Sequence, residues 1–177
     1  MTVPAATTTV VIPGLKRFTG RIRNDRSLSL RVTKMWEARY RGFTYKRFVT
    51  FSRGGGDWAP LSPRTIAARR KGRGTGTIAI LRDTSQMLNA MLPSMQNAPG
   101  ALSEHGPFLL VIGYGGPAKH AGGGSATIAD IASFHNDGAG HLPQRKIIVP
   151  PSSDVMKAMA GDCERVLKDQ SKKDVNG

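Results

Sequence analysis

The sequence predicts a mixed α/β fold of the α+β type, in which a small, mainly antiparallel sheet is flanked by helices, with an extended N-terminal arm and Gly-rich loops. Segments with apolar residues at helical spacing are separated by two short apolar runs typical of strands. The 177 residues suffice for one domain, and their 21 Gly and 11 Pro predict large turns. We therefore expect an arm over residues 1–26, one domain over residues 27–170 and a frayed tail over residues 171–177.

The N-terminal arm is rich in Thr, Pro and Ala at its start and basic toward its end. Its β-branched run, Thr8–Ile12, suits pairing with the edge of a sheet. An isolated arm of this kind is expected to be mobile, so contact with neighbouring subunits would be needed to order it.

The first predicted helix covers Ser29–Phe51. Its apolar face has large residues at helical spacing, namely Val32, Trp36, Tyr40 and Phe43. Its opposite face is basic, with Arg31, Lys34 and Arg41. Gly42 predicts a break or bend, because Gly costs about 1 kcal/mol relative to Ala inside a helix. We expect the aromatic face to pack in the core, with a base-stacking platform as the alternative.

A short helix, Pro63–Lys71, is predicted after a Gly-rich turn. Ser62 is its expected N-cap, and Pro63 suits the first turn because it lacks an amide hydrogen. The helix ends in a basic cluster next to the negative end of its dipole, and Gly72 is the expected left-handed cap. Stabilisation of the dipole explains the cluster, and nucleic-acid contact is the alternative.

The third predicted helix covers Thr84–Leu92, with Asp83 or Thr84 as its cap and Pro93 as its stop. Its inward residues are Met87, Leu88 and Met91. A strand over Phe108–Tyr114 is expected next, leading into a long Gly-rich loop.

The last predicted elements are two helices with a strand between them. Ser125 is the expected cap of a helix that ends at Gly138 and whose apolar face holds Ile128, Ile131, Ala132 and His135. A strand over Leu142–Val149 is expected to stop at a Pro pair. Ser152 or Ser153 then caps a helix with one apolar stripe: Val155, Met156, Met159, Cys163, Val166 and Leu167.

The net charge of +14 is unevenly distributed along the chain. Residues 1–74 contain 17 Lys and Arg but three acids, and the remainder contains nine of each kind. Such asymmetry favours contact with nucleic acid, an anionic surface or an acidic partner protein.

Several function classes are disfavoured by the sequence. A single cysteine, Cys163, excludes an intrachain disulfide and a Cys-based zinc module. Apolar runs are too short for a membrane helix and the start lacks the basic region of a signal peptide, so we expect a soluble protein that makes no membrane contact. No signature of a nucleophile, phosphate loop or paired carboxylates is present, and the spacing of His135, Asp137 and His141 across a Gly-rich turn does not suit a metal. We expect no cofactor, no metal and no enzymatic activity.

Three large or polar residues are candidates for contact with other subunits. Trp58 either pins its loop to the core of its own chain or fills a pocket on a neighbour. Arg145 is either a buried ion-pair partner or an interface anchor. His120 is expected in a loop or an interface.

Three segments in order, Trp58–Ile66, Ile80–Leu88 and Phe134–Ile148, resemble the phage virion-morphogenesis family, the tail-completion proteins of tailed bacteriophages. The matching positions lie between residues 58 and 149: Trp58, Pro60, Leu61, Thr65, Leu81, Asp83, Thr84, Leu88, Gly113, His135, Gly138, Pro143 and Arg145. Ser85 stands where the family commonly has Gly, a long Gly-rich insertion precedes His135, and Lys146 occupies a place often held by Pro.

The resemblance implies a structural virion protein of the neck, which forms a ring, as a hexamer, at the head-proximal end of the tail. Its implied partners are further copies of itself, the head connector or adaptor proteins, the tail terminator or tail tube proteins, and genomic DNA in the lumen. It would lie in the virion after assembly in the host cytoplasm. Trp58, Arg145, His120 and the arm are the expected interface.

The alternative function is a basic nucleic-acid-binding module. Its expected phosphate contacts are basic residues of the first helix, the end of the second helix and the turn after it: Arg31, Lys34, Arg41, Arg69, Arg70, Lys71 and Arg73.

Overall fold

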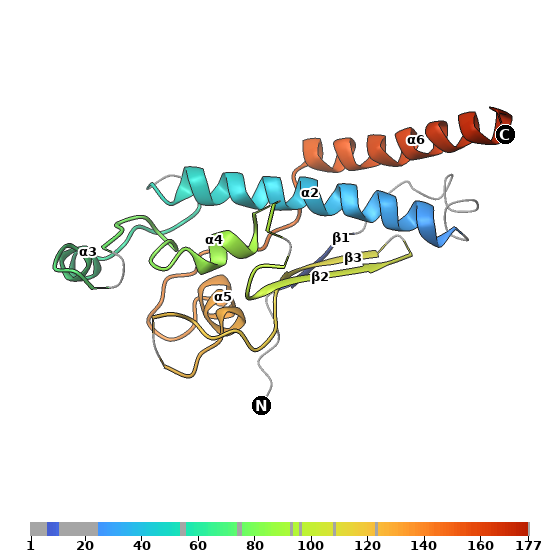
Figure 1. The fold of residues 1–177 in the computed structure, drawn as a ribbon. Coiled ribbons are helices and arrows are strands. Elements are labelled where there is room, and N and C mark those ends of the chain that lie inside the picture. Colours follow the sequence, from blue (N-terminus) through green and yellow to red (C-terminus); the bar gives the residue numbers. More distant parts are fainter. Residues whose placement is uncertain are drawn as a thin grey trace.

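The computed structural model describes residues 25–53, 56–73, 76–92, 94–95, 97–107, 109–122 and 124–173, together with the backbone of residues 7–10 and 174–176. Helices flank a small antiparallel sheet, so the predicted α+β class is confirmed (Figure 1). The elements of these residues are, in chain order, β1 (Thr7–Val10), α2 (Arg26–Phe51), α3 (Pro63–Arg70), α4 (Gln86–Ala90), β2 (Ala101–Gly106), β3 (Leu109–Tyr114), α5 (Ile128–Asp137) and α6 (Ser153–Asn176).

The sheet has the order β1-β3-β2, with both neighbouring pairs antiparallel. Thr8 lies opposite Ile112, so the prediction that the run Thr8–Ile12 pairs with a sheet edge is confirmed for residues 8–10, and the strand also includes Thr7. The rest of residues 1–24 lies outside the described residues. Strand β2 was not predicted, because its sequence ALSEHG lacks a clear alternation of apolar and polar residues.

The predicted strand over Leu142–Val149 is wrong, since this segment forms no strand. Its backbone amides bond to α5 instead of to a neighbouring strand. Arg145 N donates to His135 O at 2.7 Å, and the amides of Ile147 and Ile148 donate to Asn136 Oδ1 at 3.2 and 3.3 Å. The segment is therefore an extended strap across α5.

Helix α2 runs without a break through Gly42, so the predicted break there is wrong. Asp25 caps its N-terminus by accepting from Ser27 N and Leu28 N. Tyr40, Thr44 and Phe48 are fully buried on either side of Gly42, and their burial outweighs the low helix propensity of one glycine.

Two hydrophobic clusters flank α2 along its length. The first lies between α2, β3 and α6 and contains Leu28, Val32, Trp36, Tyr40, Leu110, Ile112, Met159, Cys163 and Val166. The second lies around the C-terminal part of α2, α4 and α5 and includes Phe48, Trp58, Met87, Leu88, Met91, Tyr114, Ile128, Ala132 and Ile147. The predicted inward residues of α4 and the predicted stripe of α6 are confirmed as core or partly buried residues.

Helix α6 packs along α2 through polar contacts as well as its apolar stripe (Figure 1). Trp36 Nε1 donates to Met159 O at 2.9 Å, and the guanidinium of Arg39 pairs with both carboxylate oxygens of the buried Asp162. The helix starts after Ser152, as predicted, but it continues through Asn176. Residues 171–176, for which a frayed tail was predicted, thus belong to α6 in this structure.

The predicted helix ends are partly confirmed. Ser62 caps α3 as expected, the helix ends at Arg70, and Gly72 follows in a left-handed conformation with φ +89°. Gly138 ends α5 at φ +72°, where a Cβ atom would lie 3.1 Å from the backbone of Gln144. Thr127 caps α5, so the predicted cap Ser125 is wrong: Thr127 forms a capping box with Asp130, whose carboxylate reaches back to the cap amide.

Helix α4 is shorter than predicted and begins differently. Its cap position is Ser85, which has φ +56° and makes no capping bond from its side chain, so neither predicted cap, Asp83 or Thr84, occupies this position. Thr84 Oγ1 nevertheless accepts from Gln86 N, the first helical amide, at 3.5 Å. The predicted stop, Pro93, and the first residue of the predicted strand, Phe108, lie outside the described residues.

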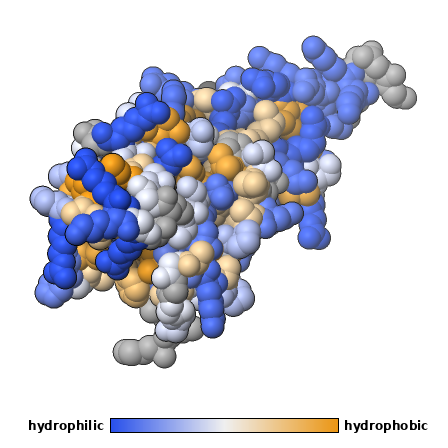
Figure 2. Space-filling model, turned by 60° about the vertical axis from the view of Figure 1, so that its left-hand side comes forward, coloured by the Kyte–Doolittle hydropathy of each residue, from blue (hydrophilic) through white to orange (hydrophobic). Residues whose placement is uncertain are grey.

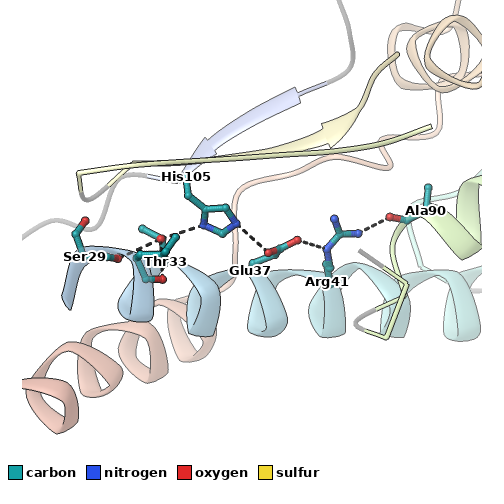
Figure 3. A network of polar contacts seen from close by, with 7 residues as sticks. Ser29, Thr33, Glu37, Arg41, Ala90 and His105 are labelled. Atoms are coloured by element: carbon teal, nitrogen blue, oxygen red, sulfur yellow. Dashed lines mark hydrogen bonds and ion pairs between the residues drawn. The ribbon is translucent and has the colours of Figure 1, made fainter. Parts of the chain in front are cut away.

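A buried network of charged side chains joins α2 to β2 and to the end of α4 (Figure 3). Glu37 accepts from Arg41 Nε at 2.7 Å and lies 3.1 Å from His105 Nε2. His105 Nδ1 lies 3.0 Å from the hydroxyl of Thr33, and Arg41 donates to the carbonyl of Ala90. Glu37 is 2% exposed and Arg41 is fully buried, so the prediction that Arg41 points outward is wrong.

The pKa of Glu37 is lowered although the carboxylate is buried. Burial acts to raise this pKa, but the nearby Ser103 and the positive charges of Arg41 and His105 outweigh it. The pKa of Glu37 is thus lower in the folded state than in the unfolded state, where it is near 4.5. The ionised carboxylate therefore stabilises the fold above pH 4.5, and this stabilisation is lost as the pH falls through the pKa of the folded state.

Among the described residues, no helix combines the length and apolar character needed to cross a membrane.

The buried network predicts that replacing one carboxylate by an amide lowers the stability of the fold substantially. Glu37→Gln leaves the Arg41 guanidinium buried without a countercharge, and we expect it to lower the free energy of unfolding by about 3 kcal/mol. Urea denaturation at neutral pH measures this loss. Glu104→Gln, at an exposed position on β2, is the control and should change stability by less than about 0.5 kcal/mol. Equal effects of the two substitutions would contradict the role of the network.

Candidate assembly interface

Two of the three segments that carry the family resemblance meet at hydrogen bonds made by the buried residue Arg145. Arg145 is 4% exposed. Its Nε donates to Ala59 O at 2.9 Å and its Nη2 donates to Pro60 O at 3.1 Å, while its own amide donates to His135 O. We call these four residues, together with Trp58, the Arg145 junction. It fixes the loop before α3 against the strap that follows α5.

Trp58 completes the junction from inside the core. The indole is 3% exposed and lies edge-on to Phe48 and Phe51, with ring centroids 5.1 and 5.7 Å apart. Its Nε1 donates to Lys146 O at 3.1 Å. The expectation that Trp58 anchors a neighbouring subunit is therefore wrong, and the alternative that it pins its loop to its own core is confirmed.

Arg145 is likewise satisfied within the chain, so its expected role as an interface anchor is wrong. The alternative, that Arg145 forms a buried ion pair, is also wrong, because its guanidinium bonds backbone carbonyls and not a carboxylate. Burial and the charge of Arg69 lower its pKa.

His120 is the predicted interface residue that keeps part of its surface exposed. Its Nδ1 accepts from Gly122 N at 3.1 Å, and its Nε2 lies 3.3 Å from the hydroxyl of Thr84. These contacts hold the Gly-rich loop after β3 against the start of α4.

Six of the family-motif positions line one cavity of about 200 Å³ beside the junction: Leu61, Leu81, Asp83, Thr84, His135 and Arg145. The other positions serve the fold around it. Thr65 bonds the Ser62 cap, Leu88 is buried in α4, Gly113 lies within β3, and Gly138 ends α5. Pro60 supplies a carbonyl to Arg145, and Pro143 is exposed at the start of the strap.

His135 is partly buried among positive charges, and its Nδ1 is buried without a hydrogen-bond partner among the described residues. Burial first, and then the charges of Arg145, His120 and Arg69, lower its pKa to about 4. The imidazole is therefore neutral at physiological pH. The predicted packing of His135 at the end of the apolar face of α5 is consistent with this position.

Helix α3 stands at one end of the molecule, beyond the C-terminal part of α2 and away from the sheet (Figure 1). None of its residues is buried. An open groove of about 370 Å³ lies beside it, lined mainly by apolar residues that include Pro60, Leu61, Ile66, Ile78 and Ile80. Ile78 is 44% exposed.

The surface around this groove is both basic and apolar. The exposed cations of this end of the chain are Arg53, Arg64, Arg70, Lys71 and Arg73. Figure 2, which brings this end of the molecule forward, shows hydrophilic side chains projecting next to hydrophobic patches. We call the groove, α3 and these cations the α3 surface.

The predicted phosphate contacts do not form one surface. Arg31 and Lys34 are exposed near the N-terminus of α2, a helix about 39 Å long at the usual rise per residue. The exposed residues Arg70, Lys71 and Arg73 lie at the other end.

Two of the predicted phosphate contacts are wrong. Arg41 is buried in the network of α2, and Arg69 is held inside the chain, where its Nη1 donates to the carbonyls of Thr77 and Ala79 at 2.7 and 2.9 Å.

Two apolar residues of the groove, Ile66 and Ile78, were not singled out from the sequence, whereas Pro60 and Leu61 were. Ile66 and Ile78 are apolar residues within a basic segment, and this mismatch is the signal that could have marked them. The network around Glu37 was also missed, although its i,i+4 spacing to Arg41 is visible in the sequence.

Within the described part of the chain, no group of three His, Cys, Asp or Glu side chains is arranged to hold a metal ion.

Comparisons with protein-family models, characterised proteins and solved structures find no match to this chain.

The low pKa of His135 predicts a specific pH dependence of stability. Because the unfolded state takes up a proton near pH 6.5 and the folded state near pH 4, stability falls as the pH drops through this window. From about pH 7 to pH 5 the expected loss is about 2 kcal/mol. His135→Gln should remove most of this loss in urea denaturation, whereas His141→Gln, at an exposed position, should retain it. A His135→Gln protein with an unchanged pH dependence would show that another group titrates.

Proposed function

We propose that the chain is a structural subunit of a tailed-bacteriophage virion, a tail-completion or neck protein without catalytic activity. In this proposal identical copies form a ring, hexameric by the family resemblance, that joins the head-proximal end of the tail to the head connector. Genomic DNA passes through the lumen. Connector or adaptor proteins on one side and tail terminator or tail tube proteins on the other are its proposed partners.

One observation carries the assembly part of this proposal: α3 has no buried residue and stands beside an open apolar groove. Isolated helices shorter than about 12 residues are marginal in water, and most helical stability comes from packing of one face. The eight residues of α3 have a good N-cap and a basic C-terminus, but little apolar packing in the single chain. A second copy that covers the α3 surface would supply it.

The charge distribution supports a contact between unlike surfaces. The excess positive charge of the chain lies within residues 1–74, which include α3, and the remainder is neutral. A ring needs two different complementary surfaces on each subunit, because its contacts are heterologous. We propose that the α3 surface of one subunit meets the neutral part of the next.

Two details favour the resemblance itself. Motif positions that are far apart in sequence line one cavity and share the Arg145 junction. Ser85, where the family commonly has Gly, has φ +56°, a conformation that glycine adopts without strain. The position therefore has the backbone geometry that would explain a family preference for Gly.

The alternative function is the basic nucleic-acid-binding module. The observation that favours it is the exposed cluster of Arg64, Arg70, Lys71 and Arg73 around α3.

Ring formation provides the first test. We expect the purified protein to form closed rings in negative-stain images and to sediment as an oligomer. Ile78→Asp places a charge in the groove and should weaken subunit association by about tenfold or more per contact. Leu109→Asp is a matched control, because Leu109 is similarly exposed (41%) but lies on β3. A monomeric wild-type protein at high concentration, or equal effects of the two substitutions, would contradict the proposal.

The salt dependence of DNA binding separates the two functions. If the cluster of α3 contacts phosphates, replacing Arg70, Lys71 and Arg73 by Gln should reduce the slope of log affinity against log salt by about 3. A dedicated binding module should show a steep slope as a monomer, measured by fluorescence anisotropy. A ring subunit should still assemble with all three residues replaced, because the apolar lining of the groove is intact, although the loss of charge weakens the contact. Loss of assembly in this variant would contradict the assignment of association to the apolar groove.

A further inference from the structure

The cavity beside the Arg145 junction has a composition that points to a ligand. It measures about 200 Å³ and is lined by ten residues of α3, α4, α5 and the segments before, between and after these helices. Four of them are apolar, namely Leu61, Leu81, Met87 and Ile131. A cavity of about 150 Å³ lined by apolar side chains is known to admit benzene, so this volume suits a molecule of about that size with one polar substituent.

The polar part of the lining contains two guanidinium cations and one carboxylate. Arg69 and Arg145 contribute two guanidinium groups, and His120 and His135 contribute two imidazoles. The carboxylate among the lining residues is that of Asp83, 3.8 Å from Arg69 Nε. The like charges act on one another, since Arg69 lowers the pKa of Arg145 and both lower the pKa of His135. One negative charge placed among them would relieve this repulsion.

The lining also holds a polar atom in need of a partner. His135 Nδ1 is buried and makes no hydrogen bond to the described residues. Buried polar atoms are normally paired, so an unpaired one at a cavity wall indicates a missing partner. Leu81 and Ser85, on either side of Asp83 and Thr84, both have φ +56°, a strained conformation for residues with side chains and one that is common at ligand sites.

The charge and the apolar wall together restrict the ligand class. A doubly charged phosphate would lose hydration against four apolar side chains and would face Asp83. A neutral apolar molecule would leave Arg145, whose guanidinium bonds backbone carbonyls, without a countercharge. A single carboxylate on an apolar body satisfies both parts of the lining.

We propose that this cavity binds the carboxylate of a small apolar acid, with the acid group near Arg69 and Arg145 and the apolar body against Leu61, Met87 and Ile131. Two sources share this chemistry: a free aromatic or aliphatic acid, and the C-terminal carboxylate of a peptide that ends in an apolar residue. The site does not depend on whether the chain forms a ring.

Binding of benzoate, followed by NMR of the histidine ring protons, is the direct test. We expect benzoate to bind and to raise the pKa of His135 from about 4, because it adds a negative charge beside the imidazole. Benzamide, which has the same shape without the charge, should bind at least about tenfold more weakly. Equal binding of the two compounds, no binding of benzoate, or the same shift with inorganic phosphate would overturn the proposal.

Substitution distinguishes binding from a structural effect. Arg69→Met keeps most of the aliphatic stem, removes the charge and should weaken benzoate binding about tenfold. Arg70→Met, the exposed neighbour on α3, is the matched control and should leave binding unchanged. If Arg69→Met does not fold, the rise in the pKa of His135 in the wild-type protein still decides the question. The affinities of N-acetylleucine and benzoate then identify the source, with N-acetylleucinamide as the uncharged control. Tighter binding of N-acetylleucine indicates a peptide C-terminus, and tighter binding of benzoate indicates a free aromatic acid.

Discussion

The buried guanidinium group of Arg145 joins the parts of the chain on which the candidate interface depends. It donates to the carbonyls of Ala59 and Pro60, directly before α3, and lies in the strap that follows α5. Without it, two partly buried hydrogen bonds would be lost, and a bond of this kind typically contributes about 0.5–1.5 kcal/mol. Trp58 holds the same loop from the core side. Arg69, within α3, also bonds the carbonyls of Thr77 and Ala79, so Arg145 shares the positioning of α3 with two other side chains.

Much of the fold follows from local patterns, and the errors have a common cause. The periodicity of α2 and α6 predicted both helices, because each buries one continuous apolar stripe. The strand over Leu142–Val149 has strand-like composition, but Asn136 and the carbonyl of His135 take the hydrogen bonds that a sheet would need. Strand β2 was missed for the opposite reason, since Ser103 and His105 face polar groups of α2 and mask the alternation of apolar residues.

The candidate site was less predictable than the fold. Trp58 and Arg145 were expected at an interface because Trp and Arg are enriched both there and in buried networks. Only tertiary structure distinguishes the two, since their partners lie 85 to 88 positions away in sequence. Arg41 and Arg69 were misplaced for the same reason: a buried cation has the same sequence signature as an exposed one. The α3 surface is exposed because no other part of the described chain packs over α3 closely enough to bury one of its residues, and a local sequence pattern carries no information about such missing contacts.

Hydrogen exchange as a function of protein concentration tests the central claim, that the Arg145 junction is internal to the chain and presents α3 for contact between copies. We predict that amides of residues 63–73 and 76–80 exchange rapidly in dilute solution and become protected as the concentration rises. Amides of the strap, residues 144–149, should be equally protected at both concentrations. Protection of α3 that does not change with concentration, or a strap that becomes protected only on association, would contradict the account.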